Sequence, residues 1–335
     1  MFDHIISDTF ESSYIESIRL LLEKGIKVCP RGSETKELAP FVLGFKNPRD
    51  RLVFNSERRI NLGFMLAECL WIMAGRNDVE MIKYYNPNIA NYSDDGFIFH
   101  GAYGPRLRKD TIDQFRAVVD KLKKDPDSRQ ALCIIWDPKR DYETTKDVPC
   151  TISYQFLIRD NGDGRRLQME ANMRSNDVIL GLSTDAFNFT MIQELIASEL
   201  NMDPGHYYHI DGSLHIYAND YEKAERIVKC HEAEGIKSFP MPEMPKNSLQ
   251  YIPVIEMIEA TVRTRESLDF DFVQSVASML PEYWQQWVYV FACYRALKEK
   301  NVTVARQFSD AMGPSHPFRS LMERSIKRQE VKLSK

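Results

Sequence analysis

Strand-like and helix-like segments alternate along this chain without a regular period, and this irregularity constrains the fold more than any other feature. A doubly wound parallel sheet needs a repeating strand–helix–strand unit, which the sequence lacks. We therefore predict an α+β fold in which a mixed sheet is packed by helices. The strand-like runs are 131–136, 151–158, 166–173 and 206–220, residues 28–52 read as a loop with strands, and the helix-like runs are 10–25, 60–75, 109–125 and 187–200.

Two apolar segments indicate how the chain is organised. Residues 60–75 are apolar on nearly all sides, which predicts a buried helix that ends at Gly75. From residue 266 onward the pattern is helical, and Trp284 and Trp287 belong to aromatic rows that are more typical of a core or an interface than of a ligand site. We predict one domain over residues 1–265 and a helical extension over 266–335, with residues 325–335 as a solvated end.

Charge and cysteine usage exclude several classes of protein. The chain carries 44 Lys and Arg against 48 Asp and Glu, a formal charge of −4, which argues against a duplex nucleic-acid surface. The sequence has no run of 18 apolar residues and no signal-peptide pattern at its start, so we expect no membrane span and a cytoplasmic setting. The six cysteines are far apart without CxxC pairs, so we predict neither a zinc site nor any other metal site.

Two side chains stand out as candidates for chemistry. Cys150 follows Pro149 and opens a strand, which places its thiol at a fixed strand end. A lone cysteine is more often a small core residue, so this position alone decides nothing. Glu68 lies on the predicted buried helix, where an unpaired carboxylate is rare.

Several short motifs accompany these residues in a fixed order. They are Arg31-Gly32, Glu68-Cys69-Leu70-Trp71, Tyr103-Gly104, Asp127-Ser128-Arg129, Val148-Pro149-Cys150, the run from Arg174 to Leu182, and Gly212-Ser213-Leu214-His215-Ile216-Tyr217. In this order and spacing, from about residue 10 to about 225, the chain resembles the folate-dependent thymidylate synthase family. The resemblance implies that residues 1–265 form a thymidylate-synthase-like catalytic domain.

The resemblance also implies a role for each matched residue. Cys150 is the expected nucleophile at C6 of a pyrimidine, and its pKa should be lowered by nearby arginines. Glu68 is expected to order water and move protons around the base. The substrate is expected to be a pyrimidine nucleoside monophosphate, and the co-substrate 5,10-methylenetetrahydrofolate. The implied nucleotide-binding residues are Arg31, Tyr103, Arg129, Arg174, Ser175, His215 and Tyr217, with Arg129 donated by the second subunit of a homodimer, and the implied folate-binding residues are Asp177 and Gly181.

The residue expected to read the base departs from the synthases. Where they have asparagine, this chain has Asp185. A carboxylate accepts hydrogen bonds and suits the exocyclic amine of cytosine, whereas it can donate to O4 of uracil only when protonated. Asp185 resembles the deoxycytidylate hydroxymethylase branch of the family, and the competing interpretation is a cap for a helix that starts at residue 186.

A second departure concerns the residues that cover the folate. The synthases have two tryptophans in a stretch that here reads Asn88 to Asp94, without an indole. A smaller, polar residue such as Asn91 or Asp94 would admit water to an exocyclic methylene on C5, and water addition gives a hydroxymethyl group. We assign Asn91 and Asp94 to the folate side of the site on this basis.

Both departures favour 5-hydroxymethylation of dCMP. The alternatives are hydroxymethylation of CMP, C5-methylation of dUMP or dCMP, and a non-catalytic nucleotide- or RNA-binding relative. The resemblance implies a cytoplasmic enzyme, in the host cytoplasm if the chain is phage-encoded.

Overall fold

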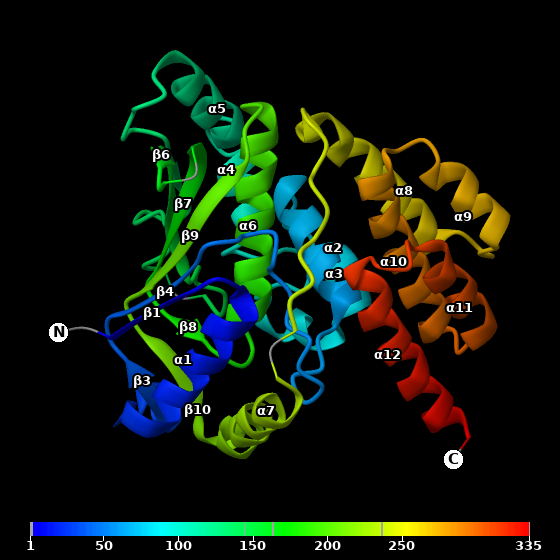
Figure 1. Cartoon of the computed structure of the whole chain (residues 1–335), viewed down its shortest axis with the longest axis horizontal. Helices are drawn as coiled ribbons and strands as arrows, with labels where there is room; N and C mark the ends of the chain where they lie inside the picture. The colour runs from blue at the N-terminus through cyan, green and yellow to red at the C-terminus, as the bar shows by residue number, and fades with distance from the viewer. Residues whose placement is uncertain (1–2, 144, 163, 236, 335) are drawn as a thin grey trace.

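The computed structural model describes residues 3–143, 145–162, 164–235 and 237–334. It contains two sheets and a large set of helices, which confirms the predicted α+β class (Figure 1). The larger sheet lies at the N-terminal side of the molecule, the helices of the last third of the chain lie on the opposite side, and α6 passes between them.

The larger sheet has six strands in the order β1-β4-β9-β7-β6-β5 and is mixed. The pairs β1–β4 and β7–β9 are parallel, whereas β4–β9, β6–β7 and β5–β6 are antiparallel. The predicted strands are confirmed, although Pro204 and Gly205 begin β9 and do not merely end the preceding helix. The bounds are β1 Asp3–Ser7, β4 Phe41–Phe45, β5 Leu132–Ile134, β6 Thr151–Asp160, β7 Arg165–Met173 and β9 Pro204–Asp211.

A smaller sheet has the order β2-β3-β10-β8, and its strands are Ile26–Val28, Thr35–Leu38, Leu214–Tyr217 and Asn176–Asp177. It forms because the segment after β9 turns back at Gly212 and pairs with β3 in an antiparallel register, in which His215 faces Glu37. Strand β8 runs parallel to β10. The small sheet therefore brings the residues after Cys29 next to those after Arg174.

Helix α6 packs against the large sheet, and the apolar helix α2 packs on α6. Helix α2, Leu62–Met73, begins at the Asn61 cap, and Gly75 follows it with a φ of +71°. Helix α6, Leu182–Glu199, is buried along nearly its whole length. The other helices before residue 236 are α1 Phe10–Lys24, α3 Val79–Tyr85, α4 Tyr103–Arg108, α5 Gln114–Lys124 and α7 Tyr221–Glu234, and short 3-10 turns are η1 Pro30–Gly32, η2 Pro87–Tyr92 and η3 Ala218–Asp220.

Two helix starts differ from the sequence prediction. Helix α5 begins at residue 114 because Asp113 caps it by accepting from the Arg116 amide. Helix α6 begins five residues before the expected start, directly after Gly181. Asp185 therefore lies inside the first turn and is not the N-cap, so the capping interpretation of Asp185 is wrong.

The last third of the chain packs its aromatic helix into the core. Trp284 and Trp287 on α10 are fully buried, and Trp287 lies 6.4 Å from the Phe187 ring on α6. Residues 325–334 are mostly half-buried or exposed, as expected, but they are helical and bury Ile326. The domain boundary at residue 265 stays a prediction. The elements are η4 Ser248–Tyr251, α8 Ile252–Thr264, α9 Phe270–Ala277, α10 Glu282–Lys298, α11 Val302–Ala311 and α12 Pro317–Leu333.

Candidate active site

Cys150 lies immediately before β6, where the large sheet meets the loop that carries Pro149. The guanidinium of Arg174 bridges this loop: its Nε donates to the Pro149 carbonyl at 2.8 Å, and Nη2 lies 3.5 Å from Cys150 Sγ. Burial raises the pKa of the Cys150 thiol, and the charge of Arg174 opposes that rise without overcoming it. The expected lowering of the Cys150 pKa is therefore wrong for the site without ligands.

A pocket of about 240 Å³ opens on the small sheet beside Cys150. It brings together five residues that the sequence assigned to the nucleotide: Arg31, Arg174, Ser175, His215 and Tyr217. Arg31 sits in η1 with a φ of +53°, which bends the loop over the pocket. One acidic residue that the sequence analysis missed, Glu37, also lines it and accepts from the Ser213 hydroxyl at 2.6 Å. Two guanidinium groups with hydroxyl donors suit a phosphate dianion.

Arg129 is not part of this pocket within one chain. It is exposed, in the loop between α5 and β5, and its carbonyl accepts from Gln155 Nε2 at 3.0 Å. A contribution of Arg129 to the phosphate pocket thus requires a second subunit.

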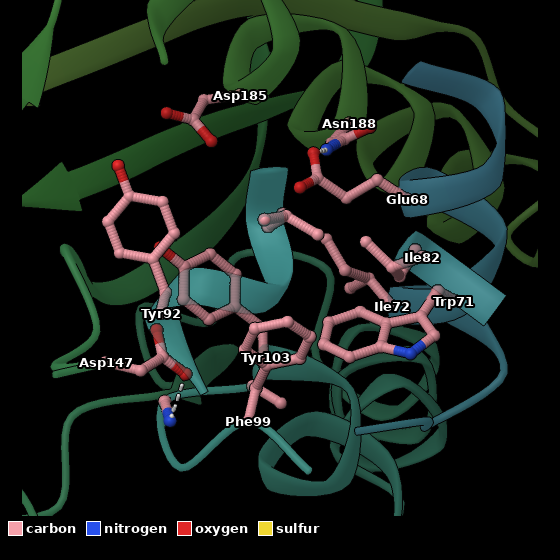
Figure 2. A pocket seen from close by; sticks show the side chains of 13 residues that line it. Glu68, Trp71, Ile72, Ile82, Tyr92, Phe99, Tyr103, Asp147, Asp185 and Asn188 are labelled. Carbon is pink, nitrogen blue, oxygen red and sulfur yellow. Dashed lines mark hydrogen bonds between the residues drawn. The ribbon is translucent and has the colours of Figure 1, made fainter. Parts of the chain in front are cut away.

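A second cavity, of about 220 Å³, lies between α2, η2 and the start of α6. Figure 2 shows Glu68, Asn188 and Asp185 along one side of it, and Trp71, Phe99 and Tyr103 along the other. The remaining lining residues are mostly apolar: Ile72, Ile82, Ile89, Tyr92, Gly101, Ala102 and Asp147. The cavity therefore has apolar walls that suit a flat ring, with carboxyl groups along one edge.

Both carboxyl groups of this edge are poised to carry a proton. Asn188 Nδ2 donates to Glu68 at 2.8 Å, yet burial and the nearby Asp185 raise the pKa of Glu68 to about 8. Burial likewise raises the pKa of Asp185 to about 6, against the opposing effects of His209 and Asn176. Perturbed carboxyl groups in one cavity are typical of a site that moves protons.

Asp177 and Gly181 form a tight turn that borders this edge. Asp177 Oδ1 accepts from the amides of Ile179 and Leu180 at 2.8 and 3.0 Å, whereas its buried Oδ2 has no hydrogen-bond partner in the described part of the chain. An unpaired buried carboxylate oxygen is unusual, and burial raises the pKa of Asp177. A Cβ on Gly181 would lie 2.6 Å from Asn176 Oδ1, so glycine is required there.

The structure does not bring Asn91 and Asp94 into the cavity. Asp94 instead accepts from the Thr145 hydroxyl and from the Lys146 amide, which ties two surface loops together and lowers the pKa of Asp94. Their neighbours Ile89 and Tyr92 line the cavity. The η2 turn has three residues per turn, and this periodicity decides which side chains face inward.

Sequence reasoning missed Asn188 and the apolar wall. Asn188 was findable, because it lies three residues after Asp185 on α6 and hence on the same helix face. Trp71 belongs to a matched motif but was given no role, and Phe99 carried no separate signal, since buried aromatic residues fill most cores. In the described part of the chain no cluster of His, Cys, Asp and Glu is arranged to hold a metal ion, and no helix is long and apolar enough to cross a membrane.

Comparison with known proteins identifies the group to which this geometry belongs. The family model described as thymidylate synthase matches residues 12–257. The chain belongs to the thymidylate synthase family. The predicted resemblance is thereby confirmed, and the matched region contains Glu68, Cys150, Arg174 and Asp185. Helices α9 to α12 lie beyond it.

Three phage proteins described as deoxyuridylate hydroxymethyltransferases are similar to this chain. The protein of Bacillus phage SP01 is 39% identical over 222 residues, which are 62% of this chain and 57% of that protein. The protein of Pseudomonas phage M6 is 35% identical over 181 residues, 53% of this chain and 51% of that protein. The protein of Delftia phage PhiW-14 is 32% identical over 244 residues, 68% and 66% respectively. The chain thus spans between half and two thirds of the length of these curated relatives.

Proposed function

We propose that this chain transfers a one-carbon unit to C5 of a pyrimidine 2′-deoxynucleoside monophosphate and hydrates that unit to a hydroxymethyl group. The observation that carries the proposal is the position of Cys150. Its thiol contacts Arg174 of the phosphate pocket and is electrostatically coupled to Asp185 of the apolar cavity. A nucleotide whose phosphate fills the pocket and whose base reaches the cavity would present C6 to Cys150.

The phosphate pocket supports a nucleotide as substrate. Arg31, Arg174 and Ser175 supply donors for the phosphate, and a dianion there would balance two cations that have no carboxylate ion-pair partner among the described contacts. His215 and Tyr217 point from alternate positions of β10 into the same pocket and are suited to hold the sugar.

Two observations bear on which base is the substrate, and they favour different bases. Asp185 at the base-reading position favours cytosine, as the sequence analysis expects, if its carboxyl group is ionised. The names of the three phage relatives favour uracil for their own reactions. The raised pKa of Asp185 supports either base, because a protonated carboxyl group no longer repels O4 of uracil.

The cavity supports 5,10-methylenetetrahydrofolate as one-carbon donor. Its walls, including Trp71, Ile82 and Ile89, suit a planar heterocycle. Asp177 does not line the cavity itself, but its charge acts on Asp185, which does. The folate supplies carbon at the oxidation level of formaldehyde. Addition of water to it then yields a hydroxymethyl group without any redox change.

Glu68, which Asn188 holds in place, is the group that moves protons in this reaction. Thiolate addition at C6 makes C5 nucleophilic, C5 takes the one-carbon unit and loses its proton, and water adds to the exocyclic methylene before Cys150 leaves. Glu68, held by Asn188 and with a pKa near 8, can both accept and release a proton near neutral pH. Tyr92 lines the cavity and is 54% exposed, so water can reach this side of the cavity mouth.

Product mass tests this function directly. We expect incubation of dUMP or dCMP with methylenetetrahydrofolate to add CH2O to one nucleotide and to form tetrahydrofolate, with no dihydrofolate absorbance. A gain of CH2 together with dihydrofolate would identify a methyltransferase and contradict the open-mouth argument. Turnover of CMP faster than of dCMP would assign the chain to ribonucleotides.

The outer face of the large sheet supports a homodimer. One residue from each of the six strands forms a row across that face. The row is Ile6, Gly44, Tyr208, Glu170, Gln155 and Leu132. The side chains at its two ends, Leu132 and Ile6, are 43% and 50% exposed. Gln155 belongs to this row and bonds the Arg129 carbonyl. Pairing of two such faces would bury apolar surface and bring Arg129 near the partner subunit.

Subunit mixing tests the shared site. We expect Cys150→Ala and Arg129→Ala to be separately impaired, and an equimolar mixture after dissociation and reassociation to regain about a quarter of wild-type activity. Half of the dimers would be hybrids with one intact site of two. A mixture no more active than the Arg129→Ala protein alone would show that Arg129 acts within its own chain or not at all.

A further inference from the structure

A third carboxyl group lines the cavity, and the proposed function gives it no role. Among the described lining residues, Glu68, Asp185 and Asp147 carry carboxyl groups. Figure 2 shows Asp147 below Tyr92, on the side of the cavity away from Glu68. Because Tyr92 is the exposed side chain at the cavity mouth, Asp147 lies where water can enter and Glu68 lies opposite.

One of the two side-chain oxygens of Asp147 fixes the orientation of its carboxyl group. Asp147 Oδ2 accepts a hydrogen bond from the Gly101 amide at 2.7 Å. A Cβ on Gly101 would lie 2.6 Å from the Asp147 carbonyl oxygen, so the close contact of these two loops requires glycine. Asp147 Oδ1 makes no hydrogen bond in the part of the chain that the structure describes. The carboxyl group is therefore held by Oδ2 and can bind water through Oδ1.

Asp147 also lies close to the nucleophile. It precedes Cys150 by three residues, in the loop that leads into β6. Burial is the main cause of the raised pKa of the Cys150 thiol, and the charge of Asp147 adds to it, so the two groups are within electrostatic range. Cys150 would bond to C6 of the base, and the neighbouring atom C5 would carry the one-carbon unit. A water molecule on Asp147 Oδ1 is therefore suited to reach the carbon attached to C5.

Glu68 is less suited than Asp147 to take a proton from that water. Burial and the nearby Asp185 raise the pKa of Glu68 to about 8, so at neutral pH Glu68 mostly carries a proton already and is ready to donate it. Its side chain also bonds Asn188 on the opposite wall. Burial raises the pKa of Asp147 as well, against the Gly101 hydrogen bond, which makes its carboxylate a stronger base than that of an exposed aspartate.

We propose that Asp147 is the general base that activates the water which adds to the exocyclic methylene. This inference rests on the proposed function. Asp147 Oδ1 takes a proton from the water while the water oxygen bonds to the methylene carbon, and the electron pair of the methylene double bond moves into the ring towards C4. That pair then re-forms the C5–C6 double bond and expels the Cys150 thiolate. The proton on Asp147 leaves to solvent beside Tyr92, so the step needs no oxidant or reductant.

Asp147→Asn in the full chain tests this assignment, because asparagine keeps an oxygen for the Gly101 amide but is not a base. The reaction contains methylenetetrahydrofolate, the C5-tritiated nucleotide that the wild type converts, and β-mercaptoethanol, a thiol that traps an exocyclic methylene which water does not take. We expect the yield of hydroxymethyl nucleotide to fall about 10²-fold in the variant, while tritium release from C5 falls by less than about threefold. The C5-thioether should then replace the hydroxymethyl nucleotide as the main product by mass.

A matched control separates loss of the base from loss of an aspartate near the site. Asp95 Oδ1 accepts from the Phe97 amide at 2.7 Å, as Asp147 Oδ2 does from Gly101, but Asp95 does not line the cavity. Asp95→Asn should therefore keep the wild-type ratio of hydroxymethyl to thioether product.

A second variant gives an independent measurement. In Asp147→Ala, added formate can enter the space of the missing carboxylate and should raise the yield of hydroxymethyl nucleotide at least about tenfold. A yield that formate leaves unchanged, a wild-type product ratio in Asp147→Asn, or tritium release that falls as far as hydroxymethyl formation would each overturn the inference. If the wild type itself forms no hydroxymethyl nucleotide, the proposed function fails; if it does and Asp147→Asn keeps its product ratio, only the role of Asp147 fails.

Discussion

Cys150→Ala is expected to abolish turnover, by on the order of 10⁴-fold or more, while nucleotide affinity changes by less than about threefold. Without a nucleophile C5 is not activated, whereas the phosphate pocket with Arg31 and Arg174 remains intact. Turnover is measured as tetrahydrofolate formation and affinity by calorimetry.

A matched thiol serves as control for Cys150. Cys230 on α7 is also partly buried and lies 3.2 Å from the Ser56 hydroxyl, outside both cavities. Cys230→Ala should retain wild-type activity. If Cys150→Ala kept more than about one hundredth of the activity, covalent catalysis at this position would be refuted. Because burial raises the Cys150 pKa, alkylation of the free protein should accelerate as the pH rises.

Glu68→Gln is expected to lower kcat by about 10² to 10⁴-fold with little effect on nucleotide affinity, because it removes the group that exchanges protons and keeps its shape. The same change should stabilise the protein at alkaline pH. The pKa of Glu68 rises from 4.5 to about 8 on folding, so between these values the folded state binds more protons than the unfolded state. Stability contributed by Glu68 therefore falls as the pH rises through this window.

The thermal midpoint measures this second effect. The gain of Glu68→Gln over the wild type should be small at pH 5 and largest above pH 8. Glu222→Gln on α7, which replaces an exposed glutamate, should give no such trend. A gain in thermal midpoint that does not change with pH would mean that the pKa of Glu68 is not raised on folding.

Much of the site was predictable because short motifs carry its chemistry. Arg31, Arg174, Ser175, His215 and Tyr217 were assigned from the sequence, and the small sheet gathers all five in one pocket. The pKa of Cys150 was not predictable, because its direction depends on the balance between burial and the Arg174 charge. Asn91 and Asp94 were chosen as polar residues in the stretch where the synthases have tryptophans, but Ile89 and Tyr92 of the η2 turn line the cavity instead.

The sequence by itself determined the α+β class, the family and the order of the reactive residues, since these depend on local periodicity and on motifs read along the chain. Only the tertiary structure decided what surrounds Asp185. Asn176, His209 and Asp211 come from two strands in different sheets, and their distances arise when β8 and β9 pack beside α6. Proton positions depend on burial and on neighbours a few ångströms away, and neither is encoded in spacing along the chain.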